Sequence, residues 1–170
     1  MDHFARLGLP AALDLEPASL DKAYFTLQRQ WHPDRFVAKP AEERARASRE
    51  AASLNDAYRT LKNPLSRAIY LASLKGVEMP GDGKTIDDPE LLMEAMEARE
   101  ALHDAGTAEA VEGLAAKAAD DLQTSLRGLG SLFLANDKPA IRKALLRLRY
   151  LDKFAGEARA RQVKLGQAKA

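Results

Sequence analysis

Apolar residues recur at helical spacing along most of the chain, and this pattern predicts an all-α protein. The first long stripe consists of Leu20, Ala23, Tyr24, Leu27 and Trp31. A matching stripe further along consists of Ala47, Ala51, Leu54, Tyr58 and Leu61. β-branched residues are scarce and never alternate with polar ones over a useful length, so no strand is predicted. Two such helices joined by a short loop bury their stripes by packing antiparallel.

Capping and breaking residues predict where the helices of this first part begin and end. Asp14 is the expected N-cap of the first long helix, with Pro17 early enough not to break it. Asn63 and Pro64 end the second, because proline disfavours helical geometry in the residue before it. Short helices are expected on either side, over 4–7 and 65–75.

The segment 76–87 holds three glycines and a proline and offers little to bury, so it is predicted to link two domains, 1–75 and 88–170. Asp88 followed by Pro89 is a strong helix start, a capping side chain before proline at the first helical position. Three further helices are predicted at 89–104, 107–134 and 138–164, forming a C-terminal three-helix bundle.

Two of these three helices carry more apolar surface than one buried stripe requires. On the first, the inward stripe is Leu91, Ala95, Ala98 and Leu102, whereas Leu92, Met93 and Met96 lie on another side, among acidic residues. On the last, Leu146, Tyr150 and Phe154 repeat outside the inward stripe. Such surplus stripes either pack against a neighbouring helix or domain, or form a protein-binding face.

Composition narrows the function classes. With 26 Lys plus Arg against 25 Asp plus Glu, no global field favours nucleic acid or membranes. The chain contains no cysteine, which excludes disulfides, thiolate ligands and cysteine nucleophiles. No apolar run approaches a membrane span, so a cytoplasmic protein is expected. A nucleic-acid role for the basic stretch 142–153 stays open, although such stretches more often form a solvated face.

The tripeptide His32, Pro33 and Asp34 lies in the loop between the two long helices and is the most informative motif of the chain. A catalytic role is disfavoured, because no Ser or Cys nucleophile is signalled nearby. A metal role is disfavoured because the three histidines lie in separate elements without a ligand spacing, and no cofactor is expected. A structural turn fixed by proline is possible, but it does not explain the particular flanking residues.

Those flanks carry a resemblance to a known family. The runs LDKAYFTLQRQWHPDRF at 20–36 and LNDAYRTLKNPLSRAIY at 54–70 resemble a J-domain, the module that activates seventy-kilodalton heat-shock chaperones. The opening MDHFARLGLP, the segment LLMEAMEAREAL and the late RLRYLDKF resemble HscB, the J-type co-chaperone family of bacterial iron-sulfur cluster assembly. The motifs are collinear over nearly the whole chain, so the resemblance predicts a co-chaperone that is not itself an enzyme.

The resemblance also implies roles for particular residues. His32, Pro33 and Asp34, with Arg35, Lys22 and Arg29 as auxiliary contacts, are implied to meet the ATPase domain of an HscA-like chaperone. An IscU-like scaffold protein is implied to bind an apolar and acidic face on the C-terminal domain. That face consists of Leu92, Met93, Met96, Glu97, Glu100, Asp104 and Tyr150.

The chain also departs from the general J-domain pattern. Asp21, Phe25 and Thr26 stand where general J-domains often carry basic residues, which favours a dedicated chaperone partner over a general one. The alternative is a general J-domain protein whose last domain serves other clients or dimerisation.

Overall fold

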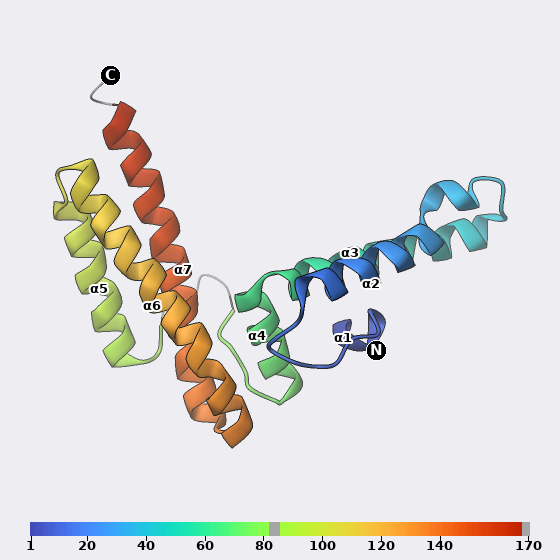
Figure 1. Ribbon diagram of the computed structural model, residues 1–170, viewed down its shortest axis with the longest axis horizontal. Helices are drawn as coiled ribbons and strands as arrows, with labels where there is room; N and C mark the ends of the chain where they lie inside the picture. Colours follow the sequence, from blue (N-terminus) through green and yellow to red (C-terminus); the bar gives the residue numbers. More distant parts are fainter. Residues whose placement is uncertain (82–85, 168–170) are drawn as a thin grey trace. The chain divides into compact units, whose positions relative to one another are not determined.

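The computed structural model describes residues 1–81 and 86–167, which form α-helices and one short 3₁₀ helix and contain no strand (Figure 1). The all-α prediction is therefore confirmed. The elements in chain order are α1 (His3–Arg6), α2 (Pro17–Trp31), η1 (Pro33–Phe36), α3 (Ala41–Lys62), α4 (Pro64–Leu74), α5 (Pro89–Asp104), α6 (Ala108–Ala135) and α7 (Lys138–Gln167). No helix of the described part of the chain is long and apolar enough to cross a membrane.

The chain divides into two compact units, Met1–Leu74 and Lys75–Ala170, and each is described on its own. Residues 82–85 of the predicted linker 76–87, and residues 168–170 at the end of the predicted second domain, lie outside the described residues. The exact domain bounds therefore stay a prediction.

Unit 1 is built on the antiparallel hairpin of α2 and α3. Leu20 from α2 and Leu54 and Leu61 from α3 are buried between the helices, as the stripes predict. Phe4 of α1 is 1% exposed and completes this core beside α3. In Figure 1 the loop that joins α2 to α3 lies at the end of the hairpin remote from α4, so the tripeptide is carried away from the bulk of the unit's core.

The predicted N-cap of α2 is wrong. The helix begins at Pro17 with Glu16 as N-cap, and the Glu16 side chain makes no capping hydrogen bond. Proline at the first helical position has its φ already set and lacks the N–H that would be left unpaired there, so it determines the start. Asp14 consequently lies outside the helix.

Unit 2 is the predicted three-helix bundle, and the start signal at Asp88 is confirmed. The Asp88 side chain accepts a hydrogen bond from the Leu91 amide at 3.1 Å, and α5 begins at Pro89. Thr107 caps α6 in the same way. The helix ends at Asn136, whose φ of 53° places it in the left-handed region and turns the chain into α7.

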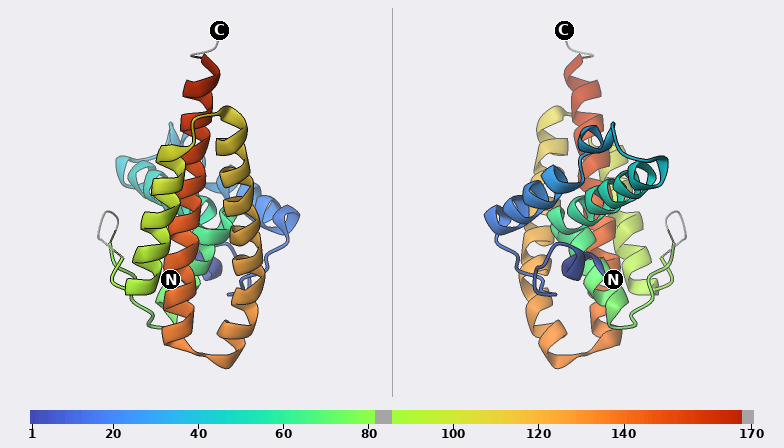
Figure 2. Two further views of the ribbon diagram at one scale, coloured as in Figure 1. Left: turned by 90° about the vertical axis from the view of Figure 1, so that its left-hand side faces the viewer. Right: turned by 90° about the vertical axis from the view of Figure 1, so that its right-hand side faces the viewer.

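Of the two interpretations of the second stripe on the last helix, packing against neighbouring helices holds, because α7 lies between α5 and α6 (Figure 2). Its inward residues Ile141, Leu145 and Leu148 are buried, but so are Leu146 and Phe154 on the second stripe. Phe154 shares a core cluster with residues of α5 and α6, as expected for a helix that packs between two others.

Candidate functional site

The loop tripeptide forms a tight, exposed turn. His32 is the C-cap of α2 and the N-cap of the 3₁₀ helix η1, and its carbonyl accepts from the Arg35 amide at 3.0 Å. The His32 Nδ1 atom lies 3.4 Å from the Asp34 amide nitrogen and 3.5 Å from the Asp34 Oδ2 atom. The Asp34 side chain is 85% exposed. An open turn of this kind suits contact with another protein better than chemistry in an enclosed pocket.

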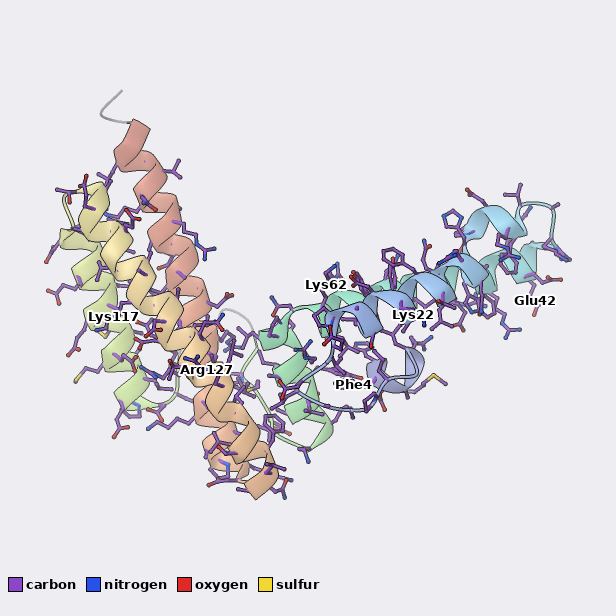
Figure 3. The ribbon with its side chains drawn as sticks, in the orientation of Figure 1. Phe4, Lys22, Glu42, Lys62, Lys117 and Arg127 are labelled. Carbon is purple, nitrogen blue, oxygen red and sulfur yellow. The ribbon has the colours of Figure 1, made fainter. Side chains whose placement is uncertain are left out.

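The three cations predicted to assist the tripeptide lie on or beside one stripe of α2. Lys22 and Arg29 are exposed and two turns apart, and Lys22 is labelled on this helix in Figure 3. The Arg29 Nε atom donates to the Phe25 carbonyl at 3.3 Å. Arg35 Nη1 donates to the Arg29 carbonyl at 3.0 Å, which ties η1 back to the end of α2. The structure therefore links the loop to the end of α2 through Arg35 and leaves Lys22, Arg29, Pro33, Asp34 and Arg35 exposed and His32 partly exposed.

An aromatic stack behind the tripeptide was not predicted as part of the site. The rings of Trp31 and Phe36, which flank the loop, lie nearly parallel with centroids 6.0 Å apart. The Arg46 guanidinium of α3 lies 5.3 Å from the Trp31 ring centroid, within cation–π range. The sequence indicated only that Trp31 belongs to an apolar stripe. The stack with Phe36 depends on the turn, and the Arg46 contact on the pairing of two helices.

The outer face of α5 is exposed, while Leu91, Ala95 and Leu102 of its inward stripe are buried. Met93 and Met96 are 64% and 63% exposed, although methionine is an apolar side chain. Leu92 is half-buried beside them. The face also carries the exposed acidic residues Glu97, Glu100 and Asp104. Two exposed methionines one turn apart, followed along the helix by three carboxylates, form an adaptable, acidic surface.

Tyr150, the seventh predicted client-binding residue, is in a different situation. It comes from α7, is only 8% exposed, and belongs to the bundle core with Leu151 and Phe154. Its ring lines the floor of a groove of about 250 Å³ between α5 and α6. Glu97 lines the same groove, so Tyr150 meets the α5 face at its edge. Burial raises the pKa of the Tyr150 phenol above its usual value.

A ladder of ion pairs fixes α5 to α7. The Arg147 guanidinium grips the Glu94 carboxylate, with Nη2 2.9 Å from Oε1 and Nε 3.1 and 3.2 Å from the two oxygens. Lys143 Nζ lies 3.4 Å from Asp88 Oδ2 and also pairs with Glu90. These bonds raise the pKa of Arg147 and of Lys143. They link the helix that presents the methionines to α7.

Contacts within unit 2 also bear on whether the basic stretch 142–153 binds nucleic acid. Arg142 pairs with Asp87 and donates to the Glu78 carbonyl, while Arg149 donates to the Pro80 carbonyl at 2.7 Å. Four cations of the stretch, Arg142, Lys143, Arg147 and Arg149, are thus bonded within unit 2. They bind the start of α5 and the segment before it, which leaves little of the stretch for a nucleic-acid backbone.

Among residues 1–81 and 86–167, no group of three or more His, Asp or Glu side chains could hold a metal ion.

Two family models match the chain, one in each compact unit. The DnaJ domain model matches residues 2–70, and the model of the HSCB C-terminal oligomerisation domain matches residues 87–159. The tripeptide lies in the first match, and the exposed α5 face lies in the second.

Whole-chain relatives agree with both matches. The chain is 42% identical over 161 residues to the co-chaperone protein HscB homolog of Cupriavidus taiwanensis, covering 90% of this chain and 89% of that one. It is 39% identical over 158 residues to the homolog of Burkholderia vietnamiensis, covering 91% and 90%.

Solved structures show the same architecture. Chaperone HscB from Vibrio cholerae superposes with a TM-score of 0.85 at 32% identity, over 97% of this chain and 99% of that chain. Human co-chaperone protein HscB superposes with a TM-score of 0.89 at 27% identity, over 97% and 84%.

Proposed function

The chain belongs to the HscB family of J-domain co-chaperones of iron-sulfur cluster assembly, and we propose which of its residues meet each partner. The partners are a heat-shock-70-type chaperone of the HscA kind and a scaffold protein of the IscU kind. Unit 1 meets the chaperone and unit 2 meets the scaffold. The observation that carries this division is that the exposed tripeptide and the exposed methionine face lie in different units.

The chaperone end consists of His32, Pro33 and Asp34 with Arg35, Arg29 and Lys22. The turn is closed by the backbone hydrogen bond from the Arg35 amide to the His32 carbonyl and is backed by the Trp31–Phe36 stack, so little ordering is needed on binding. The cations extend the surface along α2 and suit an acidic docking site. Their main contribution is to the rate and orientation of encounter.

The test of this end is the steady-state ATPase rate of the HscA-type chaperone with and without the chain. The parent raises the rate, whereas His32→Gln loses most of the stimulation while keeping the far-UV circular dichroism of the parent. Equal stimulation by His32→Gln and the parent would falsify the docking-loop assignment.

The client end consists of Leu92, Met93, Met96, Glu97, Glu100 and Asp104 on α5, with Tyr150 at its edge. Burying the exposed methionines against the scaffold supplies affinity, and the carboxylates select the partner. Because the ladder to α7 fixes α5, this face is also preformed. Tyr150 lies on the groove floor, where it supports the α5 face and offers the edge of its ring to the scaffold.

The client end is tested by calorimetric titration of the scaffold into the Met93→Ala, Met96→Ala double variant. Losing two buried methionine contacts weakens binding roughly tenfold or more. Leu134→Ala is the matched control, since Leu134 is an exposed apolar residue on α6 of the same unit. If the double variant binds as tightly as the control, the α5 face is not the client site.

The two ends together make the chain an adaptor. We propose that it carries out no covalent chemistry, that ATP hydrolysis takes place on the chaperone, and that the chain works in the cytoplasm. Carrying both ends on one molecule raises the effective concentration of scaffold beside chaperone. The alternative of a general J-domain protein with an unrelated last domain is disfavoured, because the HSCB C-terminal model matches residues 87–159.

A further inference from the structure

Phe25 is a half-exposed aromatic ring in the middle of the cationic stripe of α2. Its side chain is 50% exposed, and it lies one turn from Lys22 on one side and from Arg29 on the other. Isolated exposed apolar residues are common on protein surfaces and need no explanation by themselves. The surroundings of Phe25 distinguish it, because the ring is both held in place and joined to the tripeptide loop.

The buried side of the ring rests on two tyrosines. The Tyr24 centroid lies 5.1 Å away at an angle of 59°, and the Tyr58 centroid lies 6.4 Å away at 51°. Tyr24 and Tyr58 are themselves stacked, with centroids 4.0 Å apart. The Tyr58 hydroxyl donates to Asp21 at 2.7 Å, which fixes the stack to both helices of the hairpin. The exposed half of Phe25 is thus presented by a rigid support.

Two hydrogen bonds link the part of α2 around Phe25 to the tripeptide loop. Arg29 folds back along α2 so that its Nε donates to the Phe25 carbonyl. Arg35, the residue after Asp34, donates to the Arg29 carbonyl. A partner that covers the tripeptide and these two arginines therefore also reaches the Phe25 ring.

We propose that Phe25 is the apolar anchor of the chaperone-docking surface and a determinant of which chaperone is accepted. This inference rests on the proposed function of the tripeptide loop. The complementary site is an apolar recess flanked by carboxylates on the ATPase domain of the chaperone. Exposed cations act mainly on encounter and are screened by salt, whereas a preorganised aromatic ring adds affinity at low entropic cost.

The experiment titrates each variant against the ATPase of the HscA-type chaperone and reads the concentration for half-maximal stimulation. Phe25→Gln removes the apolar anchor and Phe25→Leu retains it. Leu74→Gln is the matched control, because Leu74 is 47% exposed and lies at the end of α4 in the same unit. The Lys22→Gln, Arg29→Gln double variant removes the cations. Each titration is run at about 50 mM and about 300 mM KCl, which changes the screening length severalfold.

We expect Phe25→Gln to raise the half-maximal concentration roughly fivefold to tenfold at both salt concentrations, with the maximal rate unchanged. Phe25→Leu stays within about twofold of the parent, and Leu74→Gln does not differ from it. The effect of removing the cations shrinks at high salt, because that contribution is electrostatic.

Two failures are distinguishable. If the parent does not stimulate the chaperone, the proposed function itself fails. If the parent stimulates the chaperone and Phe25→Gln has the same half-maximal concentration as Phe25→Leu or the parent, Phe25 is not an anchor. The assignment of the docking loop is then unaffected. A Phe25→Gln effect that disappears at high salt also overturns the anchor, because an apolar contact is not screened. Circular dichroism of each variant confirms that α2 and α3 remain folded.

Discussion

The Arg147 guanidinium holds the Glu94 carboxylate through three contacts of 2.9 to 3.2 Å, and Arg147 Nη1 also lies 3.4 Å from the Ser125 hydroxyl of α6. A single side chain of α7 thereby touches both neighbouring helices. The pair is partly exposed, so solvent screens it, yet its multiple contacts make it stronger than an ordinary surface pair. It is the most specific polar link between the α5 face and the rest of unit 2.

We predict that Arg147→Gln lowers the free energy of unfolding by about 1 kcal/mol. The change is measured by urea denaturation followed by circular dichroism. The control is Arg99→Gln, because Arg99 makes one longer contact with Glu157 at 3.6 Å and is more exposed. That variant should lose no more than about 0.3 kcal/mol. If both variants lose the same free energy of unfolding, the multiple contacts of Arg147 add no stability beyond that of an ordinary surface pair.

Tyr150 requires a more careful substitution than the methionines. Because the ring is in the bundle core, Tyr150→Ala costs about 3–5 kcal/mol of stability. A loss of scaffold affinity in that variant could therefore result from unfolding and not from a lost contact. Tyr150→Phe keeps the ring and loses only the long hydroxyl contact to the Glu94 carbonyl at 3.5 Å. We predict that Tyr150→Phe binds the scaffold within about twofold of the parent. A large loss of affinity in a stable Tyr150→Phe protein would mean that the hydroxyl itself contacts the scaffold.

The stability of unit 2 depends on pH through the N-cap of α5. The bond from the Leu91 amide and the nearby Lys143 ammonium hold the pKa of Asp88 below its usual value. A carboxyl whose pKa is lowered by folding stabilises the protein above its unfolded pKa, and that contribution is lost as pH falls through the folded pKa.

We therefore predict that the melting temperature falls on acidification below about pH 4. The decrease should be smaller in Asp88→Asn than in the parent. Asparagine still caps the helix but carries no charge to lose. The measurement is the difference in melting temperature between parent and variant from neutral to acid pH. The difference should shrink as Asp88 is protonated, and a difference that stays constant would contradict the prediction.

Trp31 is the single tryptophan of the chain, and it precedes His32 directly. Its stack with Phe36 and its contact with Arg46 place it behind the docking turn. We predict that the HscA-type chaperone changes the tryptophan emission of the chain, whereas the scaffold alone does not. Difference spectra corrected for the emission of each partner measure this. A response to the scaffold alone would be incompatible with scaffold binding confined to unit 2.

Local signals in the sequence predicted local structure well. Asp88 and Pro89 lie next to each other in sequence, and together they determine where α5 begins. Asp14 failed as a cap because Pro17, only three residues later, is the stronger start. Helical periodicity placed Met93 outside the inward stripe of α5, and the structure shows that this side of the helix is exposed.

Contacts between elements that are distant in sequence could not be predicted from the spacing of apolar residues. The second stripe of α7 looked like surplus because one buried stripe normally suffices, and only the place of α7 between two helices explains the burial of Phe154. The Glu94–Arg147 pair joins residues 53 positions apart, so no spacing rule predicts it. The support of Phe25 by Tyr58 of α3 likewise depends on how two helices pair.

The central claim is that chaperone end and client end act together because one molecule carries both. The most direct test measures the chaperone's ATPase rate in the presence of limiting scaffold, using an equimolar mixture of two full-length variants. One is His32→Gln, with an intact client end, and the other is Met93→Ala, Met96→Ala, with an intact chaperone end. The parent should give a scaffold-dependent increase that exceeds the sum of the separate effects, and the mixture should not. A mixture that restores the full increase of the parent would contradict the adaptor account.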